Sequence, residues 1–180
     1  MEFLELVRNR QSDRAYDPQR PVEKEKIDRI IEAARLAPSA CNGQPWKFII
    51  VDDPEIKKEV AKTCVSKALF INHFTQQAPV HIIIVEEKTN VSSSFGGWVK
   101  KKEFPQVDIG IAAAHIALAA EAEGLGSCMI GWFDEEKMKS ILGIPASKRV
   151  ILDIVIGYPA KPKKEKKRKS LQEICSHNKY

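Results

Sequence analysis

The chain has 180 residues and a net charge of +5, and 43% of its residues are hydrophobic, which is enough for one core. We therefore expect one domain spanning residues 1–180. The longest nearly apolar run, residues 109–120, is shorter than the ~20 residues that cross a bilayer, which argues against membrane insertion. Charges among the first sixteen residues argue against a signal peptide. Four cysteines without a C-x-x-C pair argue against a metal site or disulfides, so a cytoplasmic protein is expected.

Two helices are predicted before the first strand. Apolar residues on one face indicate a helix at the start of the chain, and apolar residues at spacings of three and four indicate another over residues 24–37, ended by Pro38. Residues 39–45 (SACNGQP) are rich in turn formers and lead into a short β-branched run at 47–51. The pattern predicts a loop that feeds a strand.

The rest of the chain alternates helices and strands. A helix is predicted over residues 55–66 and strands over 80–86, 127–131 and 150–157. An Ala-rich helix over 106–123 is apolar around nearly its whole circumference, which predicts burial on all sides. Because one small domain does not easily cover such a helix, we expect a second subunit to cover one face. The predicted fold is α+β, a three-layer α/β/α sandwich with a mixed central sheet covered by helices.

The usual phosphate-binding loops are absent from the sequence. There is no G-x-G-x-x-G and no G-x-x-x-x-G-K-[ST] motif. Gly124-Leu-Gly126 lacks the third glycine and follows a helix, so it is expected to end that helix in a left-handed turn. No Ser-His or Cys-His motif stands out, and the histidines are dispersed: His73, His81, His115 and His177. No catalytic side chain is predicted.

Three polar segments together offer a site for an anion: residues 10–14 (RQSDR), 38–46 (PSACNGQPW) and 166–169 (KKRK). Surface charge or turn chemistry explains each of them equally well alone. The last belongs to a basic run at 161–169, for which a solvated tail or nucleic-acid binding is the generic interpretation. The run has no aromatic residues that could stack on bases, which argues against nucleic acid.

In order and spacing, these segments resemble the FMN-dependent nitroreductase family along nearly the whole chain. The family's R-x-S-x-[RK]-x-[FY] motif is matched at residues 10–16 and its P-S-x-x-N-x-Q-P-W motif at 38–46. Asp108 precedes an Ala-rich helix and a G-L-G-[ST]-C-x-I-G strand at 124–131, and G-Y-P at 157–159 precedes the basic segment. Each motif alone is a weak signal, whereas four in order are a strong one.

The resemblance implies that the protein binds FMN and assigns a role to each matching position. The phosphate and the ribityl chain would be held by Arg10, Ser12, Lys166 and Arg168, and Arg14 would lie by the pyrimidine edge of the flavin, where a cation favours the reduced form. The strand end formed by Met129, Ile130, Gly131 and Trp132 would lie against the flavin ring. Pro38, Ser39, Asn42 and Gln44 would contact the flavin bound mainly to the other subunit.

The resemblance also implies a homodimer with FMN at the subunit interface, which reduces a small-molecule acceptor such as a nitroaromatic or a quinone with NAD(P)H. The flavin carries that chemistry, so a catalytic side chain is not required. A flavin-binding or redox-sensing protein with little turnover is the alternative, because residues 87–105, where longer family members carry a helical excursion, are short and Gly/Ser-rich. Phe95 and Trp98 there are candidates to stack on a substrate or simply belong to a surface loop. Asn72 is a further candidate flavin contact, and Cys41 is either a small packing residue or a redox thiol.

Overall fold

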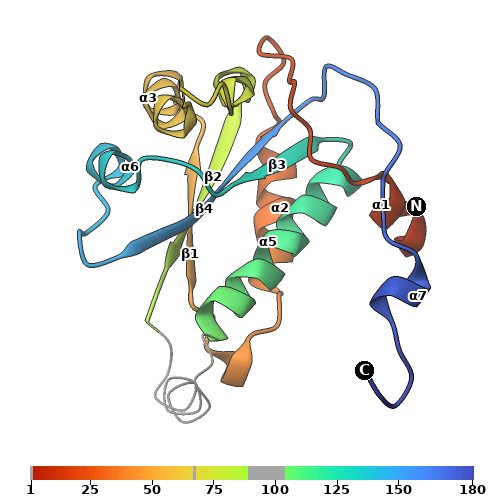
Figure 1. Ribbon diagram of the computed structural model, residues 1–180. Coiled ribbons are helices and arrows are strands. Elements are labelled where there is room, and N and C mark those ends of the chain that lie inside the picture. The colour runs from red at the N-terminus through yellow and green to blue at the C-terminus, as the bar shows by residue number, and fades with distance from the viewer. Residues whose placement is uncertain (1, 67, 89–103) are drawn as a thin grey trace.

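The computed structural model describes residues 2–66, 68–88 and 104–180 and shows a sheet with helices on both faces (Figure 1). The predicted stacking residues Phe95 and Trp98 lie outside the described residues. In chain order the helices and strands are α1 (Phe3–Asn9), α2 (Lys24–Arg35), the 3-10 turn η1 (Ala40–Asn42), β1 (Trp46–Val51), α3 (Pro54–Cys64), the 3-10 helix η2 (His73–Gln77), β2 (Val80–Glu86), α5 (Phe104–Ala122), β3 (Gly126–Ile130), α6 (Glu135–Leu142), β4 (Arg149–Gly157) and α7 (Leu171–Ile174). No helix in these described ranges is long and apolar enough to cross a membrane.

The sheet has the strand order β1-β2-β4-β3, and its neighbouring strands pair antiparallel. Each strand of this sheet therefore lies beside one that runs in the opposite direction. Within the described residues, the parallel pairing of the predicted mixed sheet is limited to one isolated bridge between Ser12 and Ser127 at the start of β3. This bridge brings the N-terminal segment to the edge of the sheet.

The central strands are buried on both faces, which divides the core in two. Alternate residues of a strand point to opposite faces. In β2, Ile82 and Ile84 pack in a cluster with residues of α2 and α5, whereas Ile83 and Val85 pack in a second cluster with residues of α3 and α6. Two helices therefore cover each face (Figure 1), which confirms the predicted α/β/α sandwich.

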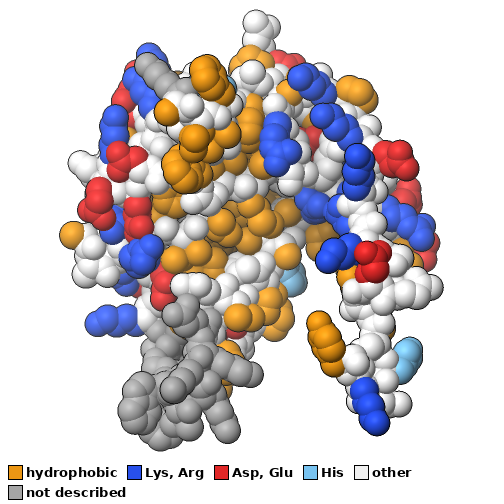
Figure 2. All heavy atoms as spheres, viewed as in Figure 1, with side chains coloured by type: hydrophobic (Ala, Val, Ile, Leu, Met, Phe, Trp, Pro, Cys, Tyr) orange, Lys and Arg blue, Asp and Glu red, His pale blue; other side chains and the backbone are white. Residues whose placement is uncertain are grey.

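Helix α5 is buried on one side only within a single chain. Ile109, Ala113 and Ile116 are fully buried, but Val107 is 60% exposed and Ala114 is exposed on the opposite side. Figure 2 shows hydrophobic side chains gathered over α5 and β3 on this face. A single chain therefore does not bury α5 on every side as predicted, because the sheet and α2 cover only part of the helix circumference.

The turn at Gly124 ends α5 as predicted. Gly124 has a φ of +74°, which favours glycine, and its N–H donates to the carbonyl of Glu121 while the N–H of Leu125 donates to that of Ala120. These two bonds form a Schellman motif. The motif turns the chain directly into β3, so it places the start of that strand beside the end of α5.

Candidate functional site

The segment from Gln11 to Tyr16 is fixed against the sheet by backbone pairing. The N–H of Asp13 donates to the carbonyl of Ser127 at 2.9 Å, and Tyr16 forms a bridge with Pro159. The buried Tyr16 hydroxyl donates to the Asp13 carbonyl at 2.8 Å. This framework leaves the side chains of Ser12 and Arg14 exposed.

A pocket of about 640 Å³ lies between the end of β3 and the segment that contains η2. Arg14 and the predicted strand end, Met129 to Trp132, line it. The side chains of Met129 and Trp132 are 41% and 56% exposed, whereas Ile130 is buried and packs in the core. We call this cavity the larger pocket, and its volume is typical of a site for a small molecule.

A smaller pocket of about 120 Å³ adjoins it. It is lined by residues 11–15 together with Lys161, Pro162 and Lys164. Arg14 lines both pockets, so the two pockets lie next to each other at this residue. The arrangement forms one elongated site with a broad end at β3 and a narrow, basic end at the C-terminal segment.

Three cations gather beside the smaller pocket, namely Arg10, Lys166 and Arg168, which we call the cation cluster. Burial and the positive charges of Arg10 and Arg168 lower the pKa of Lys166. Lys166 Nζ donates to the carbonyl of Val7 at 2.7 Å, which holds the C-terminal segment against α1. Figure 2 shows Lys and Arg side chains in a row along this segment. Clustered cations attract an anion, and a phosphate would relieve their mutual repulsion.

The remaining predicted contacts lie on the loop around η1. The Ser39 hydroxyl accepts the N–H of Gln44 at 3.0 Å, and Gln44 Nε2 donates to Asn42 Oδ1 at 3.1 Å. Asn42 and Gln44 adopt positive φ values of 53° and 45°, and Pro38 is exposed. These bonds build a compact loop with exposed amide groups.

This loop lies far from the basic end of the site in a single chain. The N–H of Ala40 donates to Asp108 Oδ1 at the start of α5, whereas Glu121, which forms an ion pair with Lys163, is in the last turn. Thirteen residues of helix correspond to about 20 Å. Figure 1 likewise shows η1 near the first residues of α5, away from the N-terminal segment. One chain therefore brings together the predicted residues of the pockets and the cation cluster. It leaves Pro38, Ser39, Asn42 and Gln44 outside the lining of both pockets and at the other end of α5 from the basic segment.

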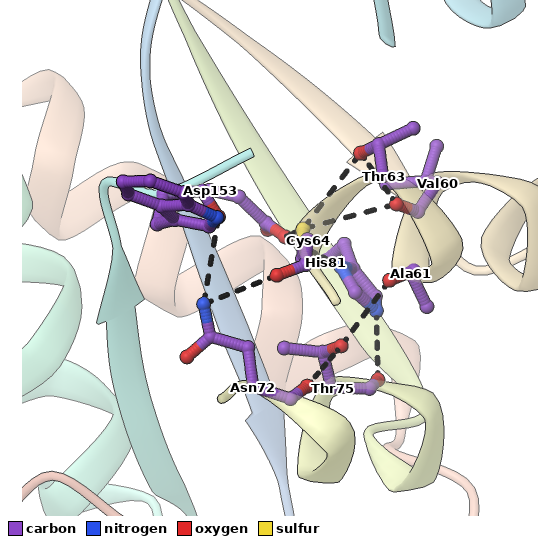
Figure 3. Close-up of polar contacts among 9 residues, drawn as sticks. Val60, Ala61, Thr63, Cys64, Asn72, Thr75, His81 and Asp153 are labelled. Atoms are coloured by element: carbon purple, nitrogen blue, oxygen red, sulfur yellow. Dashed lines mark hydrogen bonds and ion pairs between the residues drawn. The ribbon is translucent and has the colours of Figure 1, made fainter. Parts of the chain in front are cut away.

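Sequence reasoning missed most of the wall that η2 contributes to the larger pocket. The pocket is lined here by Phe70, His73, Phe74 and Gln77. It is also lined by Asn72, the one residue of this wall that the sequence predicted as a flavin contact. Asn72 Nδ2 donates to the carbonyls of Cys64 and Trp132 at 3.2 and 3.4 Å, so it ties the wall to the end of β3 (Figure 3). A 3-10 helix of five residues has no helical periodicity that would have revealed it.

A buried polar cluster lies behind this wall (Figure 3). His81 Nδ1 bonds Asp153 Oδ2 at 2.8 Å and Nε2 bonds the Thr75 carbonyl at 3.1 Å, with His81 and Asp153 both fully buried. Cys64 Sγ donates to the same Asp153 oxygen at 3.3 Å, and burial next to this carboxylate raises the pKa of the thiol. His81 is therefore a structural residue, and the histidine at the larger pocket is His73.

Comparison with known proteins identifies the family and the fold. Residues 7–72 and 63–158 match the Nitroreductase family. The chain belongs to this family. It is 34% identical to a putative NADH dehydrogenase/NAD(P)H nitroreductase of Archaeoglobus fulgidus, over 88% of this chain and 86% of that protein. It is 29% identical to an FMN reductase [NAD(P)H] of Bacillus subtilis, over 98% of this chain and 73% of that protein.

A solved structure agrees with this assignment. An FMN-dependent nitroreductase from Clostridium difficile superposes with a TM-score of 0.80 at 29% identity, over 98% of this chain and 99% of that one. The resemblance first seen in the motifs is thus confirmed for the family and the fold. The protein is an NAD(P)H-dependent oxidoreductase of the nitroreductase family.

Proposed function

We propose that the protein is a homodimeric FMN-dependent enzyme, one domain over residues 1–180, that reduces a nitroaromatic or a quinone with NAD(P)H. The observation that carries this proposal is the position of Arg14, which joins the small basic pocket to the larger pocket at the end of β3. FMN has the same two parts, a phosphate on a ribityl chain and a flat ring. We expect no metal and no essential catalytic side chain.

The basic end of the site fits a phosphate. Arg10, Lys166 and Arg168 supply three positive charges, and Ser12 supplies a hydroxyl in the adjoining pocket. Arginine offers two parallel N–H groups that match phosphate oxygens, and lysine adds a compact charge. These residues would hold the phosphate and the ribityl chain.

The broad end fits the ring. A Cβ atom added to Gly131 would meet no other atom of the chain within 4 Å, so packing inside the chain does not explain the glycine, and a flat ligand can approach the backbone there. Bound FMN would accept a hydride from NAD(P)H and pass electrons to the acceptor. Arg14 would place a positive charge beside the ring, which favours the reduced, more negative form.

A second copy of the chain would complete the site. The loop of Ser39, Asn42 and Gln44 lies about 20 Å from the basic segment of its own chain, judged by the helix between them. The exposed apolar side of α5, which includes Val107 and Ala114, offers a surface that a second copy would cover. Dimerisation through this side would bring the loop of one subunit to the flavin of the other.

The side chains at the larger pocket favour a flat aromatic acceptor. Phe70 is 83% exposed and Trp132 is 56% exposed, and both line the pocket. Exposed aromatic rings beside a cavity provide stacking surfaces for planar molecules. Quinones and nitroaromatics have this shape, which supports the acceptor class named above.

The proposal predicts that the protein purifies with bound FMN and that Arg168→Ala weakens this binding. Loss of one charge-assisted contact to the phosphate should raise the dissociation constant by about tenfold or more. Quenching of FMN fluorescence by the apoprotein measures this constant. Arg35→Ala, which removes an exposed arginine paired with Glu32 on α2, is the matched control and should leave the affinity unchanged.

Turnover is tested separately by steady oxidation of NAD(P)H in the presence of a quinone. Continuous oxidation by the FMN-loaded protein is the expected result. A flavin that is reduced once and then stays reduced in excess quinone would favour the alternative, a flavin-binding protein with little turnover. Wild-type affinity for FMN in the Arg168→Ala variant would contradict the phosphate site.

A further inference from the structure

The basic C-terminal segment has to be held in place before it binds an anion. The cation cluster places three positive charges together, and burial together with the charges of Arg10 and Arg168 lowers the pKa of Lys166. Residues 161–169 contain no helix or strand, and most of their side chains are exposed. Repulsion would drive such a segment away from the domain unless specific contacts retain it.

One retaining contact comes from the end of α5. Glu121 is only 8% exposed and forms an ion pair with Lys163, whose side chain is 47% exposed. Lys163 lies three residues before Lys166 and so fixes the point where the segment leaves the domain. The Schellman turn at Gly124 holds the last turn of α5, which makes Glu121 a rigid anchor.

A second contact ties the same stretch to the N-terminal segment. The N–H of Lys164 donates to Gln11 Oε1 at 3.0 Å, and Gln11 Nε2 donates to Asp13 Oδ1 at 2.7 Å. The Asp13 carboxyl lies against the backbone of Gly126, where a Cβ atom would approach Asp13 Oδ2 to 2.6 Å. The position of the Asp13 side chain therefore requires a glycine at residue 126. The charges of Glu121 and Lys163 both act on the Asp13 carboxyl.

We propose that Glu121, through its ion pair with Lys163, is a positioning residue that holds the basic segment in its FMN-binding arrangement before the cofactor arrives. The inference rests on the proposed function, since it concerns the phosphate end of the same site. Preorganisation of this kind raises affinity because the segment does not lose conformational entropy when the ligand binds. Glu121 itself does not touch the phosphate.

The direction in which one substitution changes the FMN dissociation constant tests this proposal. Glu121→Gln removes a negative charge close to an anion site, so Coulomb attraction alone predicts tighter FMN binding. Positioning predicts the opposite, a rise of about tenfold in the FMN dissociation constant, because the segment is released. Fluorescence quenching by the apoprotein gives the constant directly.

Riboflavin, which lacks the phosphate, separates positioning from general damage. Its affinity should stay within about twofold of the wild-type value in the Glu121→Gln variant, since the positive charges of the released segment act mainly on the phosphate, which riboflavin lacks. Glu123→Gln is the matched control, because Glu123 lies two residues farther on and pairs with Arg29 of α2 instead. It should change neither affinity.

A second variant covers the case in which Glu121→Gln leaves Lys163 unpaired and the protein fails to fold. The combination of Glu121→Gln with Lys163→Met removes both charges and preserves the net charge. It should weaken FMN binding by about tenfold as well and spare riboflavin. Unchanged or tighter FMN binding in these variants, or an equal loss for riboflavin, would overturn the proposal. A wild-type protein that bound neither flavin would contradict the proposed function instead.

Discussion

At the residue scale, one oxygen of the Asp153 side chain bonds two buried side chains at once. The Thr75 carbonyl only accepts hydrogen bonds, so His81 Nε2 carries a proton, and Asp153 Oδ2 bonds both His81 Nδ1 and the Cys64 thiol. Removal of the carboxylate would leave these groups unsatisfied where the histidine has no exposed surface. Such losses are among the most destabilising single changes in a protein.

Asp153→Ala should therefore lower the free energy of unfolding by about 3–5 kcal/mol, the usual cost of breaking a buried pair. Urea denaturation followed by circular dichroism measures this loss. Asp28→Ala on the surface of α2, where Asp28 pairs with the exposed Lys24, is the matched control and should cost far less. Equal effects of the two variants would show that the buried cluster contributes little to stability.

At the element scale, the sequence predicted those elements whose patterns are long or strongly apolar. Strand β2 has the predicted bounds, and α5 and β4 differ from their predicted ranges by one or two residues at a terminus. Helix α6 was missed, although Asp134 caps its start and Gly143 with a φ of 64° ends it. Eight residues with two charges in the first turn give too short an amphipathic pattern to detect. The η2 wall was missed for the same reason.

The residues of the candidate site also fall into those that the sequence predicted and those that it missed. Ser12, Arg14 and Gly131, which belong to recognised motifs, line the pockets, whereas the motif at residues 38–46 contributes no residue to them. Phe70 and His73 could not be assigned, because their position at the pocket depends on how the loop before β2 packs against the end of β3. Glu121 looked like one more residue of a helix terminus, and its ion pair with Lys163 appears only in three dimensions.

The exposed side of α5 gives a prediction at this scale. Ala114 is exposed within one chain, so Ala114→Glu should leave the fold of a single chain intact. In a dimer that covers this side, the same carboxylate would be buried without a partner at a cost of several kcal/mol. The variant should therefore be a folded monomer that has lost most of its FMN. Sedimentation with absorbance at a flavin wavelength follows mass and cofactor together.

Ala146→Glu is the control for this substitution. Ala146 is exposed and follows α6, which covers the opposite face of the sheet from α5 (Figure 1). It should remain dimeric and keep its flavin. A dimeric, FMN-replete Ala114→Glu protein would contradict dimerisation through α5.

At the scale of the whole molecule, the two groups of predicted cofactor residues occupy opposite ends of α5. The cation cluster lies near its last turn, where Glu121 pairs with Lys163, and the η1 loop is bonded to Asp108 near its first. A helix is a rigid spacer, so internal motion of one chain cannot bring the loop to the cation cluster. If the cation cluster and the η1 loop both contact FMN, the two groups in each site have to come from different chains, as a two-fold symmetric dimer would allow.

Subunit complementation tests this arrangement. One variant carries Lys166→Ala with Arg168→Ala, and the other carries Asn42→Ala with Gln44→Ala; each should form homodimers that bind FMN weakly, because both sites of either homodimer are defective. A heterodimer purified through two different tags would combine both defects in one site and leave the other site intact, so it should hold about half of the wild-type FMN. If instead each chain built its own site, every site in the heterodimer would carry a defect and flavin binding would stay weak. The ratio of flavin to protein absorbance in the doubly tagged species distinguishes the two architectures, with wild-type heterodimers carrying the same two tags as the reference for full occupancy.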